Sequence, residues 1–239
     1  MAVTFDLFGT LVDVEYPSDP AEIVARELES RGVEVPDDWH VAYGERHVDA
    51  PVGAEVPLPA HVAHALDSRG VETTIDGGVN ADVATLADVV IVAVPPYHVA
   101  DTIEAVAADL DDGDILVTPA TGMDRDDDGF HYAPPPAGSV TEHAASAVPD
   151  GVELVGAFHN LAAGRLANLD ADLGVDTFVV GDDGDAKGIV TDIAEGIDGL
   201  RALDAGGLGN AAEVESLTPL LINVAANNDG LHDLGLELK

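Results

Sequence analysis

The sequence is poor in several residue types. It contains no cysteine, only two lysines among 239 residues, and aromatic side chains at 4% of positions. The absence of cysteine excludes a disulfide framework and a thiolate-ligated zinc site. The longest apolar run covers residues 89–94, whereas a membrane-spanning helix needs about 20 apolar residues. No basic stretch precedes an apolar segment at the N-terminus, so we expect no signal peptide, no membrane partner and a cytoplasmic location.

Basic residues are few beside acidic ones. The formal net charge is −37, from 46 Asp and Glu against 9 Lys and Arg. Such a surface repels nucleic acid and anionic membranes, so we expect neither as a partner. It also repels itself, unless salt at about 1 M shortens the screening length to about 3 Å. Because an apolar share of 46% is typical of a folded chain, the acidity predicts a protein of a halophilic organism and does not mark a binding site.

Apolar runs and amphipathic segments alternate along most of the chain. Strands are predicted over residues 2–8, 88–94, 115–118, 154–159, 177–180 and 200–203. Helices are predicted over residues 20–30, 59–68, 99–110, 186–197 and 210–227. This alternation predicts an α/β fold with a doubly wound parallel sheet (Rossmann-like) and a C-terminal helical segment. In such a sheet, ligands bind at the carboxyl ends of the strands.

A short repeat lies in the first third of the chain. Residues 28–34 recur as residues 66–72 with a single change. One interpretation is two ordinary helix ends, each stopped by a glycine. A second interpretation is a fusion of two coding sequences, with its seam at the later copy. On the second interpretation the chain has two domains, residues 1–70 and 71–239.

The first predicted strand ends in a carboxylate. Asp6 is followed by Gly9 and Thr10 in an otherwise apolar run, and a carboxylate at a strand end can act as a nucleophile. Over residues 1–70 this run resembles the first motif of the haloacid dehalogenase-like hydrolases, which implies that Asp6 is the nucleophile. Phe8 stands where phosphatases of that family have a second aspartate, as in the dehalogenase-like branch. The alternative is that this segment supplies only a strand and a helix.

Three later strands end in turns that suit a dinucleotide site. In chain order these turns contain Val94, Pro95, Pro96 and Tyr97, then Thr121, then His159 and Leu161. Together with the segment over residues 209–223, they resemble the archaeal NADPH-dependent reductases of coenzyme F420, a deazaflavin. The resemblance covers residues 66–239.

This resemblance implies an oxidoreductase that transfers a hydride between NADP(H) and coenzyme F420 and works as a homodimer. The residues implied to line the nicotinamide nucleotide are Val94, Pro95, Pro96 and Tyr97. The residues implied to line the deazaflavin are Thr121, His159, Leu161, Leu234 and Gly235. Hydride transfer needs two rings held together in a dry pocket, and it needs neither a metal nor an acid–base side chain.

One part of the family pattern is missing. In these reductases the first strand runs into a glycine-rich turn, which lets a helix N-terminus meet the pyrophosphate. Here the first strand runs into Asp6, and the glycine-rich run over residues 206–209 lies near the C-terminal helix instead. We therefore expect weak NADP binding with largely intact deazaflavin contacts. A non-catalytic fusion product and a hydrolase that uses Asp6 are the alternatives.

Overall fold

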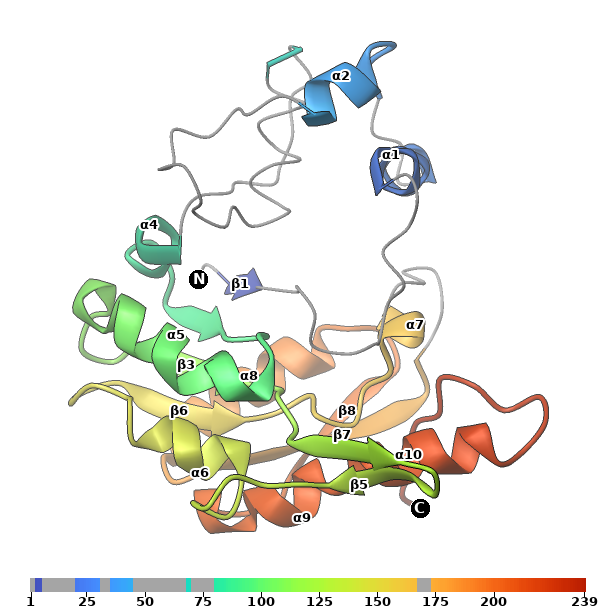
Figure 1. The fold of residues 1–239 in the computed structure, drawn as a ribbon. Helices are drawn as coiled ribbons and strands as arrows, with labels where there is room; N and C mark the ends of the chain where they lie inside the picture. Colours follow the sequence, from blue (N-terminus) through green and yellow to red (C-terminus); the bar gives the residue numbers. More distant parts are fainter. Residues whose placement is uncertain (1–2, 6–19, 31–34, 45–67, 70–79, 167–172) are drawn as a thin grey trace.

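The computed structural model describes residues 3–5, 20–30, 35–44, 68–69, 80–166 and 173–239 (Figure 1). The main element of these ranges is a six-stranded sheet in the order β1-β2-β3-β6-β7-β8. Its strands are β1 (Val3–Phe5), β2 (Val89–Ile91), β3 (Ile115–Thr118), β6 (Glu153–Gly156), β7 (Val175–Gly181) and β8 (Leu200–Asp204). Helices separate most of these strands, so the predicted Rossmann-like α/β fold is confirmed.

The strand β1 lies at the edge of the described sheet and runs parallel to β2. The register pairs Val3 with Val89 and Phe5 with Ile91. In the dinucleotide-binding order 3-2-1-4-5-6, the first strand lies beside the fourth. β1 has the equivalent position, because β3 and then β6 follow β2 across the sheet. The N-terminal segment therefore supplies the strand that precedes a phosphate loop in dinucleotide-binding folds.

One strand pair departs from the predicted parallel sheet. β6 and β7 pair antiparallel, with Val155 opposite Gly181 and Gly156 opposite Val180, whereas the other pairs of this sheet are parallel. A parallel connection requires a crossover, which is usually a helix of several turns. In the described part of the connection from β6 to β7, the helix is the four-residue α7 (Ala163–Leu166). The sheet is therefore mixed, which the alternation of segments did not reveal.

Helices cover both faces of the sheet. These helices are α5 (Val99–Val106), α6 (Val140–Ala145) and α8 (Gly184–Glu195). Ala186 and Val190 of α8 are buried against one face. Ile103 of α5 is buried on the other face with Leu116 of β3, and both are 0% exposed. Ile103 and Leu116 each contribute about 1.5–3 kcal/mol to folding through their burial.

Side-chain caps set where two of these helices begin. Ser139 Oγ accepts from the Glu142 N–H at 2.9 Å before α6, and Asp183 Oδ1 accepts from the Ala186 N–H at 2.8 Å before α8. These bonds satisfy amides that have no partner within the helix. Because Asp183 is the cap, α8 starts at Gly184, two residues before the predicted start.

The helix predicted over residues 210–227 is divided. It consists of η3 (Leu208–Asn210), α9 (Ala211–Glu215) and α10 (Leu217–Ala226). Pro219 has no N–H to donate to the carbonyl of Glu215, so a continuous helix loses a hydrogen bond there. Proline is tolerated in a first turn, which is its position in α10.

A β-hairpin that the sequence did not predict packs against α10. It consists of β4 (Met123–Asp126) and β5 (Gly129–Tyr132). The Asn223 side chain accepts from the Phe130 N–H at 2.8 Å and donates to the Phe130 carbonyl at 2.7 Å. The hairpin is thereby fixed to α10 through backbone groups.

Two helices near the N-terminus pack against each other. α1 (Pro20–Ser30), which the sequence predicted, buries Leu28, and α2 (Trp39–Gly44) buries Trp39. The Trp39 indole N–H donates to the Ala21 carbonyl at 2.8 Å. α4 (Asn80–Ala84) precedes β2, and most of the helix predicted over residues 59–68 lies outside the described residues. None of the helices in the described ranges is long and apolar enough to cross a membrane.

Candidate functional site

Two predicted site residues lie close together beyond the carboxyl ends of β3 and β6. Thr121 follows β3 and His159 follows β6, and both are buried, at 8% and 1% exposure. Thr218 of α10 joins them. Its hydroxyl donates to the His159 carbonyl at 2.6 Å and lies 3.4 Å from Thr121 Oγ1. The C-terminal helix therefore closes the site that these two strand ends open.

The His159 ring is buried and neutral. Burial lowers the pKa of His159 to about 3, because the charged imidazolium cannot be solvated there. Nε2 lies 3.4 Å from Thr141 Oγ1. Nδ1 is the one buried side-chain nitrogen or oxygen atom without a hydrogen-bond partner among the described residues. Such an atom in a folded protein requires an explanation, and a ligand is one.

A buried carboxylate, that of Glu215, binds the Thr141 hydroxyl that lies beside the His159 ring. Glu215 of α9 is 0% exposed and accepts from four donors, the amides of Val140 and Thr141, the Thr141 hydroxyl and the Tyr132 hydroxyl, at 2.9–3.0 Å. Burial raises the pKa of Glu215, and these four hydrogen bonds oppose that rise. The carboxylate thereby ties the start of α6 to α9 and to the hairpin.

The turn that carries His159 has an unusual backbone conformation. Phe158 has φ of 67°, in the left-handed region that large side chains rarely adopt. Its N–H donates to Thr177 Oγ1 at 3.2 Å, and the Asn160 side chain donates to the Asp176 carbonyl at 2.7 Å. Residues of β7 therefore hold this turn in place. Such conformations cost about 1–3 kcal/mol and cluster at functional sites.

The structure also brings Leu161 and Gly235 together through Val175. Leu161 is buried in one cluster with Leu173 and Val175. The backbone of Gly235 packs so closely on the Val175 side chain that a Cβ at this position would collide with it. Leu234, the neighbouring predicted residue, is half-buried. The C-terminal segment thus packs on Val175, which lies in the same buried cluster as Leu161.

Two arginines hold this C-terminal segment. Arg165 donates to the carbonyls of Leu173, at 2.6 Å, and Asp233. Arg201 binds both carboxylate oxygens of Asp176 at 2.7 Å each. The same carboxylate accepts from the Leu238 N–H at 2.6 Å. The Arg201 guanidinium holds the pKa of Asp176 below its ordinary value, so the pair stays charged.

The residues predicted to line the nicotinamide lie beyond β2. Val94 is buried at 7% exposure, Pro95 and Pro96 are half-buried, and Tyr97 is 75% exposed. Tyr97 belongs to the short helix η1 (Pro96–His98), and its ring lies 4.5 Å from that of His98, centroid to centroid. This group therefore has an apolar base in the core and an aromatic side chain that extends into solvent.

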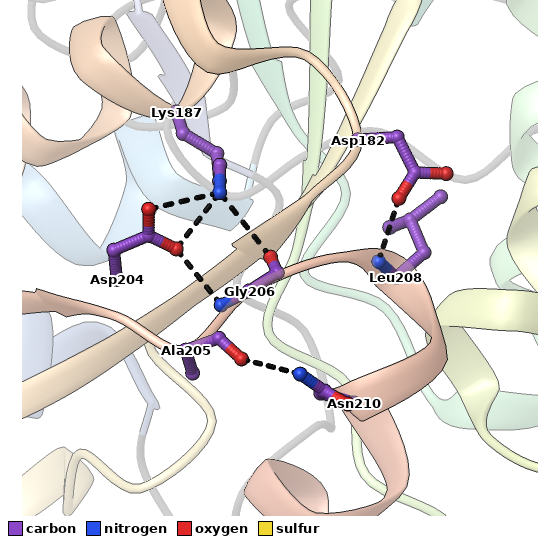
Figure 2. Close-up of polar contacts among 7 residues, drawn as sticks. All are labelled: Asp182, Lys187, Asp204, Ala205, Gly206, Leu208 and Asn210. Atoms are coloured by element: carbon purple, nitrogen blue, oxygen red, sulfur yellow. Dashed lines mark hydrogen bonds and ion pairs between the residues drawn. The ribbon is translucent and has the colours of Figure 1, made fainter.

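The glycine-rich run over residues 206–209 connects β8 to η3, and polar side chains hold it (Figure 2). Lys187 Nζ binds both oxygens of Asp204, at 2.8 and 3.0 Å, and the Gly206 carbonyl at 3.3 Å. Asp182 accepts from the Leu208 N–H at 3.0 Å. Because this run follows the last strand of the sheet, it does not take the place of the missing first-strand turn.

Sequence reasoning missed the polar residues behind the site. Glu215 and Thr218 were not singled out, because the residues that they contact lie 59 to 97 positions away in the chain. Asp6 and Thr10, the residues of the hydrolase-like motif, lie outside the described residues. Within the described ranges, no three His, Asp or Glu side chains gather in a way that could hold a metal ion.

The strand order and the position of the site define a Rossmann-like oxidoreductase fold. A solved structure from Arthrobacter sp. FB24, described as an F420-dependent NADP reductase, has this fold, with a TM-score of 0.59 and 22% identity. The superposition covers 68% of this chain and 73% of that one.

Sequence comparisons give the family. The profile of the family described as NADP oxidoreductase coenzyme F420-dependent matches residues 54–122, and so begins before residue 66. The F420-dependent NADP reductase of Methanocaldococcus jannaschii is 35% identical over 161 residues, 66% of this chain and 71% of that protein. That of Methanothermobacter marburgensis is 34% identical over 157 residues, 64% of this chain and 70% of that protein. The chain belongs to the F420-dependent NADP reductase family.

Proposed function

We propose that this protein transfers a hydride between NADP(H) and coenzyme F420. Membership of the reductase family supports this proposal. The structural observation that carries it is the cluster of Thr121, His159 and Thr218, which lies where ligands bind in open α/β sheets. The buried Nδ1 of His159 has no hydrogen-bond partner among the described residues, which supports a ligand at this histidine.

The chemistry of the site fits a flat heterocyclic ring. The side chains around it are threonine, leucine and a neutral histidine, and the close backbone of Gly235 completes the wall. When bound, the nicotinamide and the deazaflavin supply the hydride donor and the hydride acceptor. This chain positions the two rings and excludes water, which is what a hydride transfer requires of the protein.

Each group of residues has its own task in this proposal. Val94, Pro95, Pro96 and Tyr97 bind the nicotinamide nucleotide. Thr121, His159, Leu161, Leu234 and Gly235 bind the deazaflavin of F420. Because burial keeps His159 neutral at physiological pH, the ring binds and orients the ligand and does not act as an acid.

We expect this protein to have a low affinity for NADP. β1 lies where the phosphate-binding strand lies in related folds, yet Asp6 follows it instead of a glycine-rich turn. A carboxylate close to a pyrophosphate repels it, whereas the amides of a helix N-terminus attract it. We expect the protein to bind F420 more tightly than NADPH.

Separate titrations with NADPH and with F420, in molar KCl, test these statements. Binding of both coenzymes, with F420 the tighter, supports the proposal. Binding of F420 alone indicates a half-site without catalysis, as expected of a non-catalytic fusion product. Binding of neither leaves the family relationship as ancestry only.

A second candidate function rests on the N-terminal segment. Asp6 follows a strand of the sheet directly in sequence, which is the position of a nucleophile in the haloacid dehalogenase-like hydrolases. The comparisons support only the reductase. Turnover of a haloacid or a phosphate ester, abolished by Asp6→Asn, is the result that favours a hydrolase.

The proposal includes the setting in which the protein works. We propose the cytoplasm of a halophilic archaeon, because the charge of −37 requires salt for a stable compact state. We propose a homodimer because the resemblance to the reductases implies one. We also propose a seam near residue 70, between a segment over residues 1–70 and a reductase domain over residues 71–239. Light scattering in molar KCl measures the oligomeric state, and the sequence of the native locus tests the seam.

A further inference from the structure

The two ring nitrogens of His159 have unlike surroundings. Nε2 lies 3.4 Å from the hydroxyl of Thr141, whereas Nδ1 has no hydrogen-bond partner among the described residues. The ring itself is 1% exposed. A neutral imidazole carries its single proton on one nitrogen only, and the bond made by one nitrogen decides the role of the other.

The hydrogen bonds of Thr141 show which ring nitrogen of His159 carries the proton. The Thr141 hydroxyl has one proton, and it donates that proton to Glu215 Oε1 at 2.9 Å. Glu215 accepts from four donors, as an ionised carboxylate does. The competing bond to His159 Nε2 is longer and has a neutral acceptor, and hydrogen bonds to charged acceptors are the stronger ones. Thr141 Oγ1 therefore accepts from His159, so Nε2 carries the proton.

The bare nitrogen is consequently Nδ1, which faces no donor of the described chain. A buried acceptor without a partner is destabilising, and folded proteins seldom retain one without a water molecule or a ligand. Burial keeps the ring neutral, since the pKa of His159 is lowered to about 3. The site therefore holds a permanent hydrogen-bond acceptor that cannot become a donor near neutral pH.

We propose that Glu215 and Thr141 fix His159 as its Nε2–H tautomer, so that Nδ1 accepts a hydrogen bond from a ring N–H of the bound deazaflavin. This inference rests on the proposed function. Glu215 and Thr141 are positioning residues, because they act through His159. The acceptor favours a ring that carries an N–H over an analogue in which that nitrogen is methylated.

The first test reads the tautomer directly, without a coenzyme. The ¹⁵N resonances of the histidine rings, recorded in molar KCl, distinguish a protonated nitrogen from a bare one, and His159→Gln identifies the relevant pair. We expect a protonated Nε2 and a bare Nδ1. A protonated Nδ1, or a mixture of both tautomers, overturns the inference. Thr141→Val removes the hydroxyl and should release the preference, whereas Thr141→Ser should retain it.

The second test adds F420 to the wild-type protein. We expect the His159 Nδ1 resonance to shift on binding, and Thr141→Val to weaken F420 binding about tenfold, the loss of one buried hydrogen bond. Thr141→Ser should stay near the wild type, and the affinity for NADPH should not change. If F420 binds and the His159 Nδ1 resonance does not shift, this inference is overturned, whereas the proposed function is not. Failure of the wild type to bind F420 overturns the proposed function and the ligand part of this inference, while the tautomer reading stands alone.

Discussion

Asp176 and Arg201 form a two-point ion pair, in which Nε and Nη2 of the arginine each lie 2.7 Å from a different carboxylate oxygen. The Asp176 side chain is 2% exposed and also accepts from the Leu238 N–H. Its backbone N–H donates to the Leu236 carbonyl, and its carbonyl accepts from Asn160. One residue of β7 therefore joins the turn that carries His159 to the C-terminal segment that carries Gly235.

Replacing Arg201 should release this C-terminal segment. In Arg201→Met the Asp176 carboxylate stays buried without its partner, which is destabilising. We expect faster proteolysis between residues 228 and 239 and weaker F420 binding, with unchanged NADPH binding. Arg201→Lys keeps the charge but cannot bind both carboxylate oxygens as the guanidinium does. Its rate of proteolysis and its F420 affinity should therefore lie between those of the wild type and of Arg201→Met. Equal protease resistance in all three proteins argues against the pair as the anchor.

Gly235→Ala should be destabilising, because the new Cβ collides with the Val175 side chain. Overpacking of this kind costs about 1–3 kcal/mol. Gly188→Ala is the matched control. Gly188 lies in α8 with no atom within 4 Å of the added Cβ, so this change should stabilise by about 0.5–1 kcal/mol. Urea unfolding in molar KCl measures both, and equal effects of the two substitutions contradict the packing seen at Gly235.

Acidification should destabilise the protein through His159. The folded-state pKa is lowered to about 3 from 6.5, so between these values the unfolded chain binds a proton that the folded protein excludes. Stability is therefore lost as the pH falls through this window, by up to about 1.4 kcal/mol per pH unit and by about 2 kcal/mol in all from pH 6.5 to 4.5.

The comparison with His159→Gln isolates this contribution. Glu215 acts in the opposite direction, because its raised pKa makes the folded protein more stable as the pH falls. His159→Gln keeps Glu215 and removes the imidazole, so its stability should fall less than that of the wild type over the same range. Parallel pH profiles of the two proteins are the outcome that refutes the buried neutral histidine.

Salt should stabilise the folded protein and strengthen F420 binding. The net charge of −37 opposes both the compact state and the approach of the anionic tail of F420, and molar salt screens it. We expect the Tm and the F420 affinity to rise together with KCl concentration. Sucrose at equal osmolality is the control, because it stabilises without screening charge. Binding that tightens as salt is removed runs against this account.

The sequence predicted those parts of the fold that short-range patterns control. The apolar strand over residues 115–118 and the helix that follows Asp183 depend on neighbours within a few positions, and both were predicted, the helix with its start two residues too late. The hairpin over residues 123–132 was missed, because its charged residues resemble a loop. The antiparallel pairing of β7 was missed for another reason, since strand direction depends on a partner in space.

The candidate site divides in the same way. His159 and Thr121 follow strand ends, and the resemblance to the reductases pointed to them. Glu215 and Thr218 contact residues 59 to 97 positions away in the chain, and no local pattern reports such contacts. The ion pair between Asp176 and Arg201 likewise depends on the adjacent positions of β7 and β8 in the sheet. These residues become visible only when the chain is folded.

The most direct test of the central claim is the reduction of F420 by NADPH in molar KCl, followed by the loss of the F420 absorbance. The account predicts a loss that requires both the protein and NADPH, saturates at low F420 concentration and needs much higher NADPH concentration. No turnover at saturating NADPH, together with no binding of F420, would contradict it.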